Sequence, residues 1–223
     1  MAIADAYEVV PQQQRDDRGV FLEWYREDLL RQARGHGLDL RQANCSVSVA
    51  GVLRGIHFAM VPPGQAKCIT CLSGAILDVV VDIRVGSPTF GRWEAARLDD
   101  VDRRAVYVAE GLGHAFMALT EKATVSYLCS EVYSPDREFG IDPFDRAIGI
   151  EWPTGLTSIV SPKDKAAPSL ADAQRAGLLP QYEACRTYYE ALRSASNARP
   201  SDSRHGGNSG RPTVRQPSWP STE

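Results

Sequence analysis

The sequence has few of the features that mark several large classes of protein. Its 223 residues include no hydrophobic run near the roughly eighteen residues that span a bilayer. The segment Met1–Pro11 lacks the apolar stretch of a signal peptide. There is no basic block, and the formal net charge of −3 argues against nucleic acid as the main partner. We therefore expect a cytoplasmic protein that binds neither membranes nor nucleic acid.

Cysteine is scarce, and its pattern fits neither a disulfide framework nor a metal site. The five thiols are odd in number and scattered through apolar segments, which indicates reduced side chains that pack as small hydrophobic groups. Cys68 and Cys71 form a CxxC, but no second CxxC or pair of histidines follows to complete a zinc site. We interpret both residues as part of a strand in the core.

The chain does contain many short apolar or alternating segments, separated by turn sequences such as PPG, GSP and EGLG. With 43% hydrophobic residues it can bury one sizeable core. This spacing predicts an all-β sandwich or barrel rather than a parallel α/β sheet. The expected strands cover residues 42–53, 65–72, 75–85, 92–98, 104–109, 115–119 and 124–133.

Helices are expected only near the two ends of the domain. Residues 27–34 fit a short helix after an N-terminal hairpin. Ser169 and Asp172 have the spacing of a capping box, for a helix that ends at Gly177. Pro180 is placed to begin one more helix.

The composition changes after residue 193. From Ser194 onward the chain is rich in Ser, Pro and Gly, and Trp219 is its only large apolar residue. Such a segment buries too little surface to offset its chain entropy. We expect one domain over residues 1–193 and a disordered tail over residues 194–223.

Histidine is rare as well, with four residues, and two of them lie in apolar segments. His57 stands in GVLRGIHF and His114 in GLGHAF. Taken singly, each is more simply a neutral core histidine with one hydrogen bond. However, Lys67 and Tyr127 fall on other expected strands of the same presumed barrel, and buried lysine or tyrosine needs a polar partner. This gathering predicts a polar pocket inside the β-fold.

Arg54 belongs to the same group, although an ideal strand would point it away from His57. A bulge at Gly55 would bring the two side chains to one face. Alternatively, Arg54 acts at the rim of the barrel or on another layer.

A metal site is disfavoured by the residues themselves. The interval from Gly51 to His57 resembles the first half of a cupin metal motif. The second histidine of that motif is replaced by Ala59 and its glutamate by Lys67. A cation in place of an anionic ligand opposes a divalent ion, so we expect no metal.

The residue types of the pocket suggest a reaction class. Arginine fits phosphate oxygens, histidine takes a proton near neutral pH, and tyrosine can return one. Lysine stabilises a developing oxyanion. Together they predict proton abstraction beside a carbonyl group, on a substrate that carries phosphate.

The chain resembles the dTDP-4-dehydrorhamnose 3,5-epimerases, which are deoxysugar epimerases of the cupin-like jelly-roll class. The resemblance runs from about residue 7 to residue 182. It rests on DDRGVFLEWY (16–25), RQANCSVSVAGVLRGIHF (41–58), PPGQAKCITCLSGAILDVVVDIRVGSPTFGRW (62–93), YVAEGLGHAF (107–116), VSYLCSEVYSP (125–135), GIEWP (149–153) and SPKDKAAPSL (161–170).

The resemblance implies a role for each matching residue. His57 would be the general base and Asp164 the carboxylate that orients it. Tyr127 would be the acid on the opposite face of the sugar, and Lys67 would lie beside the carbonyl oxygen. The implied substrate contacts are Arg18, Glu23, Gln42, Asn44, Arg54, His114, Tyr133, Glu138 and Lys163. Among them, Tyr133 would stack on the thymine ring. Arg18 and Glu23 would come from the partner subunit of a homodimer, through exchange of the N-terminal segment.

The implied reaction converts dTDP-4-dehydro-6-deoxy-D-glucose to dTDP-4-dehydro-L-rhamnose at carbons 3 and 5. It needs no cofactor, and the chain has no GxGxxG fingerprint. Relatives that invert only carbon 3 or only carbon 5 share the same residues, so a mono-epimerase remains an alternative. A non-catalytic nucleotide-sugar binding module is a second alternative. A metal-dependent dioxygenase or isomerase is a third, weakened by Ala59.

Overall fold

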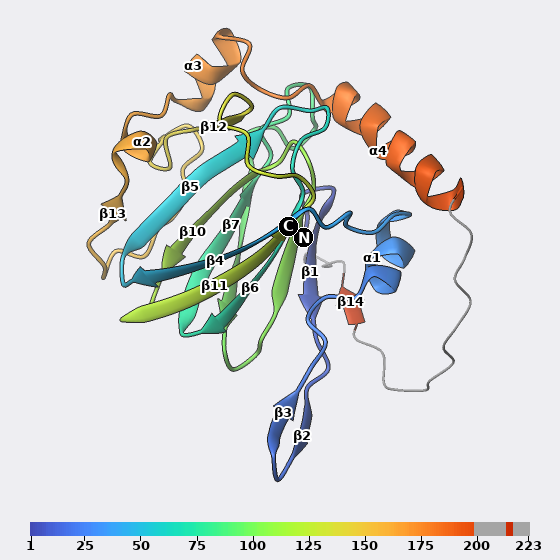
Figure 1. The fold of residues 1–223 in the computed structure, drawn as a ribbon. Helices are drawn as coiled ribbons and strands as arrows, with labels where there is room; N and C mark the ends of the chain where they lie inside the picture. The colour runs from blue at the N-terminus through green and yellow to red at the C-terminus, as the bar shows by residue number, and fades with distance from the viewer. Residues whose placement is uncertain (199–212, 216–223) are drawn as a thin grey trace, which may run out of the picture.

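The computed structural model describes residues 1–198 and 213–215 and consists of two facing β-sheets (Figure 1). The first has the order β14-β1-β9-β6-β11-β4, and the second β12-β5-β10-β7-β8 with β13 beside β5. The first-sheet strands are β1 (Ala6–Val10), β4 (Gln42–Val49), β6 (Lys67–Ser73), β9 (Ala105–Val108), β11 (Lys122–Cys129) and β14 (Thr213–Arg215). Those of the second are β5 (Val52–Ala59), β7 (Ala75–Val81), β8 (Trp93–Asp99), β10 (Gly113–Ala118), β12 (Glu138–Gly140) and β13 (Ile159–Val160).

The predicted all-β architecture is therefore confirmed, although several strand boundaries differ from those expected; for example, β7 ends at Val81 and β11 ends at Cys129. The segment 42–53, expected as one strand, is divided by a turn into β4 and β5. Gly51 lies in that turn with φ of 81°, and a side chain there would overlap the carbonyl oxygen of Thr157. The turn sends the chain from the first sheet to the second, and β5 carries His57.

The two faces of β7 pack against different cores. Ile76 and Val80 lie between the sheets, in the same cluster as Ile69 of β6. Val79 and Val81 face the outside of the second sheet and are covered by the chain that follows β12. The strand is thus buried on both sides, and Asp78, between Ile76 and Val80, points into the sandwich.

The helices lie at the ends of the domain, as predicted. α1 (Glu27–Arg34) has the expected bounds. Ser169 is the N-cap of α3 (Leu170–Arg175), because its Oγ accepts the Asp172 N–H at 3.1 Å. α2 (Pro162–Lys165) and α4 (Tyr182–Ala198) complete the set. No described helix is long and apolar enough to cross a membrane.

Two segments extend beyond the sandwich. β2 (Gln14–Asp16) and β3 (Gly19–Phe21) pair only with each other and form a hairpin that projects away from the sheets (Figure 1). At the other end, α4 continues to Ala198, past the expected domain boundary. Within the expected tail, β14 pairs antiparallel with β1. The remainder of that tail, 199–212 and 216–223, lies outside the described residues.

Candidate active site

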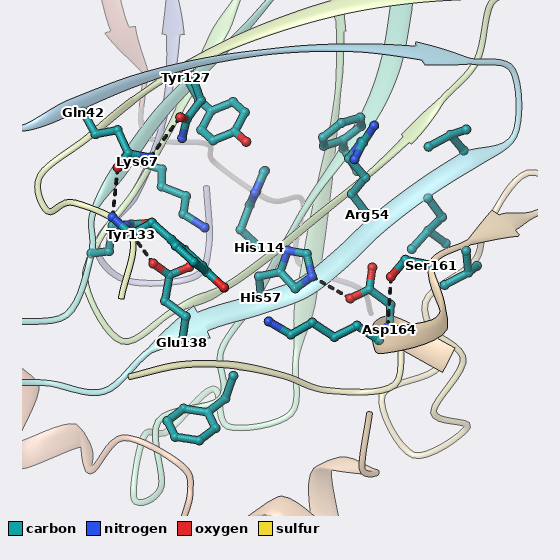
Figure 2. Close-up of a pocket in the computed structure, with 18 of the residues that line it drawn as sticks. Gln42, Arg54, His57, Lys67, His114, Tyr127, Tyr133, Glu138, Ser161 and Asp164 are labelled. Atoms are coloured by element: carbon teal, nitrogen blue, oxygen red, sulfur yellow. Dashed lines mark hydrogen bonds and ion pairs between the residues drawn. The ribbon is translucent and has the colours of Figure 1, made fainter. Parts of the chain in front are cut away.

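A cavity of about 450 Å³ opens between the two sheets. Its lining includes every candidate catalytic or substrate-binding residue of the sequence analysis except Arg18 and Glu23; Figure 2 shows most of them. These residues come from both sheets, α2 and the loop after β11: Gln42, Asn44, Arg54, His57, Lys67, His114, Tyr127, Tyr133, Glu138, Lys163 and Asp164.

A bulge in β5 places Arg54 and His57 on the same face. In the pairing of β5 with β10, His57 is opposite His114 and Arg54 is opposite Phe116. Three steps along β5 thus match two steps along β10, so β5 holds one extra residue. Gly55, at φ of 126°, lies within the bulge. The bulge therefore allows both side chains to line the cavity.

His57 is held by a carboxylate from α2. Its Nε2 lies 2.7 Å from Asp164 Oδ1, and Nδ1 has no partner within the described chain. Asp164 is itself fixed, because its N–H donates to Oγ of Ser161, the N-cap of α2, at 3.1 Å. Burial alone would raise the pKa of Asp164, but the hydrogen bond and charge of His57 lower it below the ordinary value. The pair has the arrangement of an oriented base.

Tyr127 enters the cavity from the other sheet. It lies on β11, whereas His57 lies on β5, so the phenol and the imidazole come from opposite walls. Burial raises the pKa of Tyr127, the nearby Cys129 raises it further, and Arg54 opposes both effects. The phenol therefore keeps its proton at neutral pH and is available as an acid.

Lys67 is a cation of the cavity that forms no ion pair with any described residue. Burial lowers its pKa, and the charges of Cys129, Glu138 and Asp78 partly restore it. An ammonium group in this position can stabilise negative charge that appears on a substrate oxygen.

Backbone and amide contacts order the end of the cavity near β4. Gln42 Oε1 accepts the Tyr133 N–H at 2.9 Å, and Gln42 Nε2 donates to Asn44 Oδ1 at 2.9 Å. Glu138 Oε1 accepts the Ser134 N–H at 3.2 Å. The Tyr133 side chain remains 56% exposed, which leaves its ring open to an aromatic ligand.

The structure adds residues that the sequence did not single out. Gln65 and Ser161 line the cavity. Behind its wall, Asp78 Oδ2 lies 2.7 Å from His114 Nε2. A signal for Asp78 was present, since an aspartate between Ile76 and Val80 on a buried strand needs a partner. The sequence alone did not indicate which residue that partner was.

Arg18 and Glu23 lie away from this cavity within the chain. Arg18 forms an ion pair with Asp16 on the projecting hairpin. Glu23 contacts Arg26 at 3.4 Å, next to α1. The chain by itself therefore does not bring these two residues to the site.

Among the described residues, no cluster of three or more His, Cys, Asp or Glu side chains is arranged to hold a metal ion. Cys68 and Cys71 are buried free thiols on β6. The expectation that the site needs no metal or cofactor stays a prediction.

The fold is that of a cupin-like jelly-roll protein, and its cavity of about 450 Å³ is lined by titratable side chains from both sheets. Comparison with known proteins identifies the family of the chain. The family described as dTDP-4-dehydrorhamnose 3,5-epimerase matches residues 1–172. The chain belongs to this family, and it is an epimerase of the isomerase class that acts on a sugar.

Three similar proteins illustrate the range of the family. A dTDP-4-dehydrorhamnose 3,5-epimerase of Mycolicibacterium smegmatis is 55% identical, over 86% of this chain and 95% of its own. A dTDP-4-dehydrorhamnose 3-epimerase of Streptomyces niveus is 55% identical over 83% and 89%. The crystal structure of ChmJ, a 3'-monoepimerase of Streptomyces bikiniensis in complex with dTDP-quinovose, is 47% identical with a TM-score of 0.85, over 87% and 98%.

Proposed function

We propose that the protein converts dTDP-4-dehydro-6-deoxy-D-glucose to dTDP-4-dehydro-L-rhamnose by inverting carbons 3 and 5. One observation carries this proposal: the His57–Asp164 pair and Tyr127 enter one cavity from opposite sheets, with Lys67 in the same lining. The relatives include 3,5-epimerases and 3-epimerases of equal identity, so inversion of both carbons is our inference.

The chemistry follows from the ketone at carbon 4. It acidifies the hydrogens on carbons 3 and 5, and His57 Nδ1 accepts one of them while the electron pair moves to the ketone oxygen. Asp164 stabilises the protonated imidazole, and Lys67 Nζ donates a hydrogen bond to the enolate oxygen. Tyr127 then delivers a proton to the opposite face, and the electron pair returns to carbon. The phenolate regains its proton from solvent as His57 releases its own, so nothing is oxidised or reduced.

The remaining lining suits the nucleotide. Arg54 and Lys163 are cations without an acidic partner among the described residues, and they suit the diphosphate. The exposed Tyr133 ring suits stacking on thymine. The amides Gln42 and Asn44, with Glu138, supply polar contacts at the same end.

We further propose a homodimer in which the N-terminal hairpin reaches the partner's site. The hairpin carries Arg18 and leaves the Phe21 side chain 69% exposed. β4 is the last strand of the first sheet and leaves Val47 55% and Val49 56% exposed. An open strand with apolar side chains favours pairing with another segment. A cytoplasmic location, expected from the sequence, stays a prediction.

Turnover in heavy water tests the proposal. We expect deuterium at both carbons 3 and 5 and a rhamnose-series product. Deuterium at one carbon only would establish a mono-epimerase. Binding of the nucleotide sugar without any exchange would establish a binding module instead. Loss of activity on chelation would favour the metal-dependent alternative.

A further inference from the structure

Asp78 is a fully buried carboxylate that the proposed chemistry does not use. It lies on β7 between Ile76 and Val80, with no exposed surface, and does not line the cavity. A carboxylate in such surroundings is costly unless a donor or cation compensates it. The buried Asp78 carboxylate therefore needs a hydrogen-bond donor or a cation as its partner.

The partner is His114, a residue of the cavity. Asp78 Oδ2 lies 2.7 Å from His114 Nε2, across the pairing of β7 with β10. A carboxylate accepts hydrogen bonds, so this contact requires a proton on Nε2. His114 Nδ1 then remains for the cavity and has no hydrogen-bond partner within the described chain.

Asp78 also acts on Lys67. Its second oxygen, Oδ1, is buried without a hydrogen-bond partner among the described residues. Lys67 comes from the facing sheet, and the charge of Asp78 opposes the loss of its proton in the buried site. The contact of Asp78 with a cavity residue is that with His114, and its charge in addition favours the protonated form of Lys67.

We propose that Asp78 is a positioning residue of the active site: it fixes the His114 ring with Nδ1 directed at the sugar. This inference rests on the proposed epimerase chemistry. It makes Asp78–His114 the counterpart of Asp164–His57, with the first pair serving substrate polarisation and the second serving proton removal.

The first test uses the unaltered protein. NMR of protein labelled with ¹⁵N in histidine should show His114 Nε2 carrying a proton throughout the pH range of activity. A His114 ring with a bare Nε2 would overturn the proposal. This measurement does not depend on turnover, so it stands apart from the proposed function.

The second test compares Asp78→Asn with the unaltered enzyme. We expect kcat to fall about ten- to a hundred-fold, the effect of a lost hydrogen bond to a charged group. The ¹⁵N signals of His114 in this variant should show a changed protonation of its two ring nitrogens, because a neutral amide no longer requires the proton on Nε2.

Matched variants separate positioning from mere stability. Asp78→Glu should restore part of kcat. Ile76→Ala, on the same face of β7, should lower stability and leave the His114 signals unchanged. An unchanged kcat together with unchanged His114 signals in Asp78→Asn, with the unaltered enzyme active, would overturn this inference alone. An unaltered enzyme without exchange would overturn the proposed function instead.

Discussion

His57 and His114 are directly opposite each other on β5 and β10, and each ring contacts its own carboxylate at 2.7 Å. The two histidine side chains differ in how far they are exposed. The His57 side chain is 35% exposed to the cavity, whereas that of His114 is 10% exposed. A base that must reach a carbon-bound hydrogen needs the more open position. The greater exposure of His57 therefore supports the proposal that His57, and not His114, removes the proton.

Replacement of each histidine by asparagine should separate these roles. His57→Asn removes the base, and we expect solvent exchange at carbons 3 and 5 to fall about 10²- to 10⁴-fold. His114→Asn keeps the base and should retain measurable exchange with a smaller loss. Deuterium incorporation followed by NMR gives both rates. Equal losses in the two variants would contradict the assignment.

Tyr127→Phe should uncouple exchange from inversion. The variant still contains His57, so a proton can leave and return on the same face. We expect epimerised product to fall about 10²- to 10⁴-fold, while deuterium still enters the starting sugar. Analysis of both sugars after incubation in heavy water measures the two outcomes. If exchange and inversion fall together, Tyr127 is not the separate acid.

Much of this site was predictable because its residue types are unusual for buried strands. Lysine and histidine in apolar segments indicated a polar cavity before any geometry was known. Asp164 was different, since a carboxylate in a polar loop has no local signal. Only the resemblance to a family pointed to it, and the fold then placed it 2.7 Å from His57.

The common face of Arg54 and His57 was not predictable, because strand alternation places residues three apart on opposite sides. The extra residue in β5 reverses that rule, and a bulge depends on the pairing partner as well as on the strand. The role of Asp78 was hidden for a similar reason. Its partner is distant in sequence and is brought close only by the pairing of β7 with β10.

The bulge gives a prediction for Gly55→Ala. A Cβ at this position would lie 2.5 Å from the Cβ of Ala115, at a φ of 126°. We expect a loss of about 1–3 kcal/mol in the free energy of unfolding, together with reduced kcat as His57 shifts. Urea denaturation and steady-state kinetics measure both effects. Gly86→Ala is the control, because Gly86 also has a positive φ of 89° but open space around it. Equal stability and kinetics in the two variants would show that the close approach is unimportant.

The dimer proposal predicts that two inactive variants complement each other. Arg18→Ala damages the hairpin, and His57→Asn damages the cavity. If the hairpin serves the partner's site, a mixed dimer has one site with both residues intact. Equal mixtures should therefore recover about a quarter of the unaltered activity after subunits exchange. The separate variants measured at the same total concentration are the control. No recovery, despite mixed dimers detected by mass spectrometry, would rule out exchange of the hairpin.

The buried His36 should make the free energy of unfolding depend on pH. The side chain is buried, its Nε2 has no partner among the described residues, and burial with the nearby Arg34 lowers its pKa from 6.5 to about 4. Between those values the unfolded chain binds a proton that the folded chain does not. The free energy of unfolding should thus fall as pH decreases from 6.5 towards 4. His36→Gln lacks this group, so its stability should fall less over the same interval. Urea titrations of both proteins at several pH values measure the difference, and parallel curves would show that His36 does not titrate on unfolding.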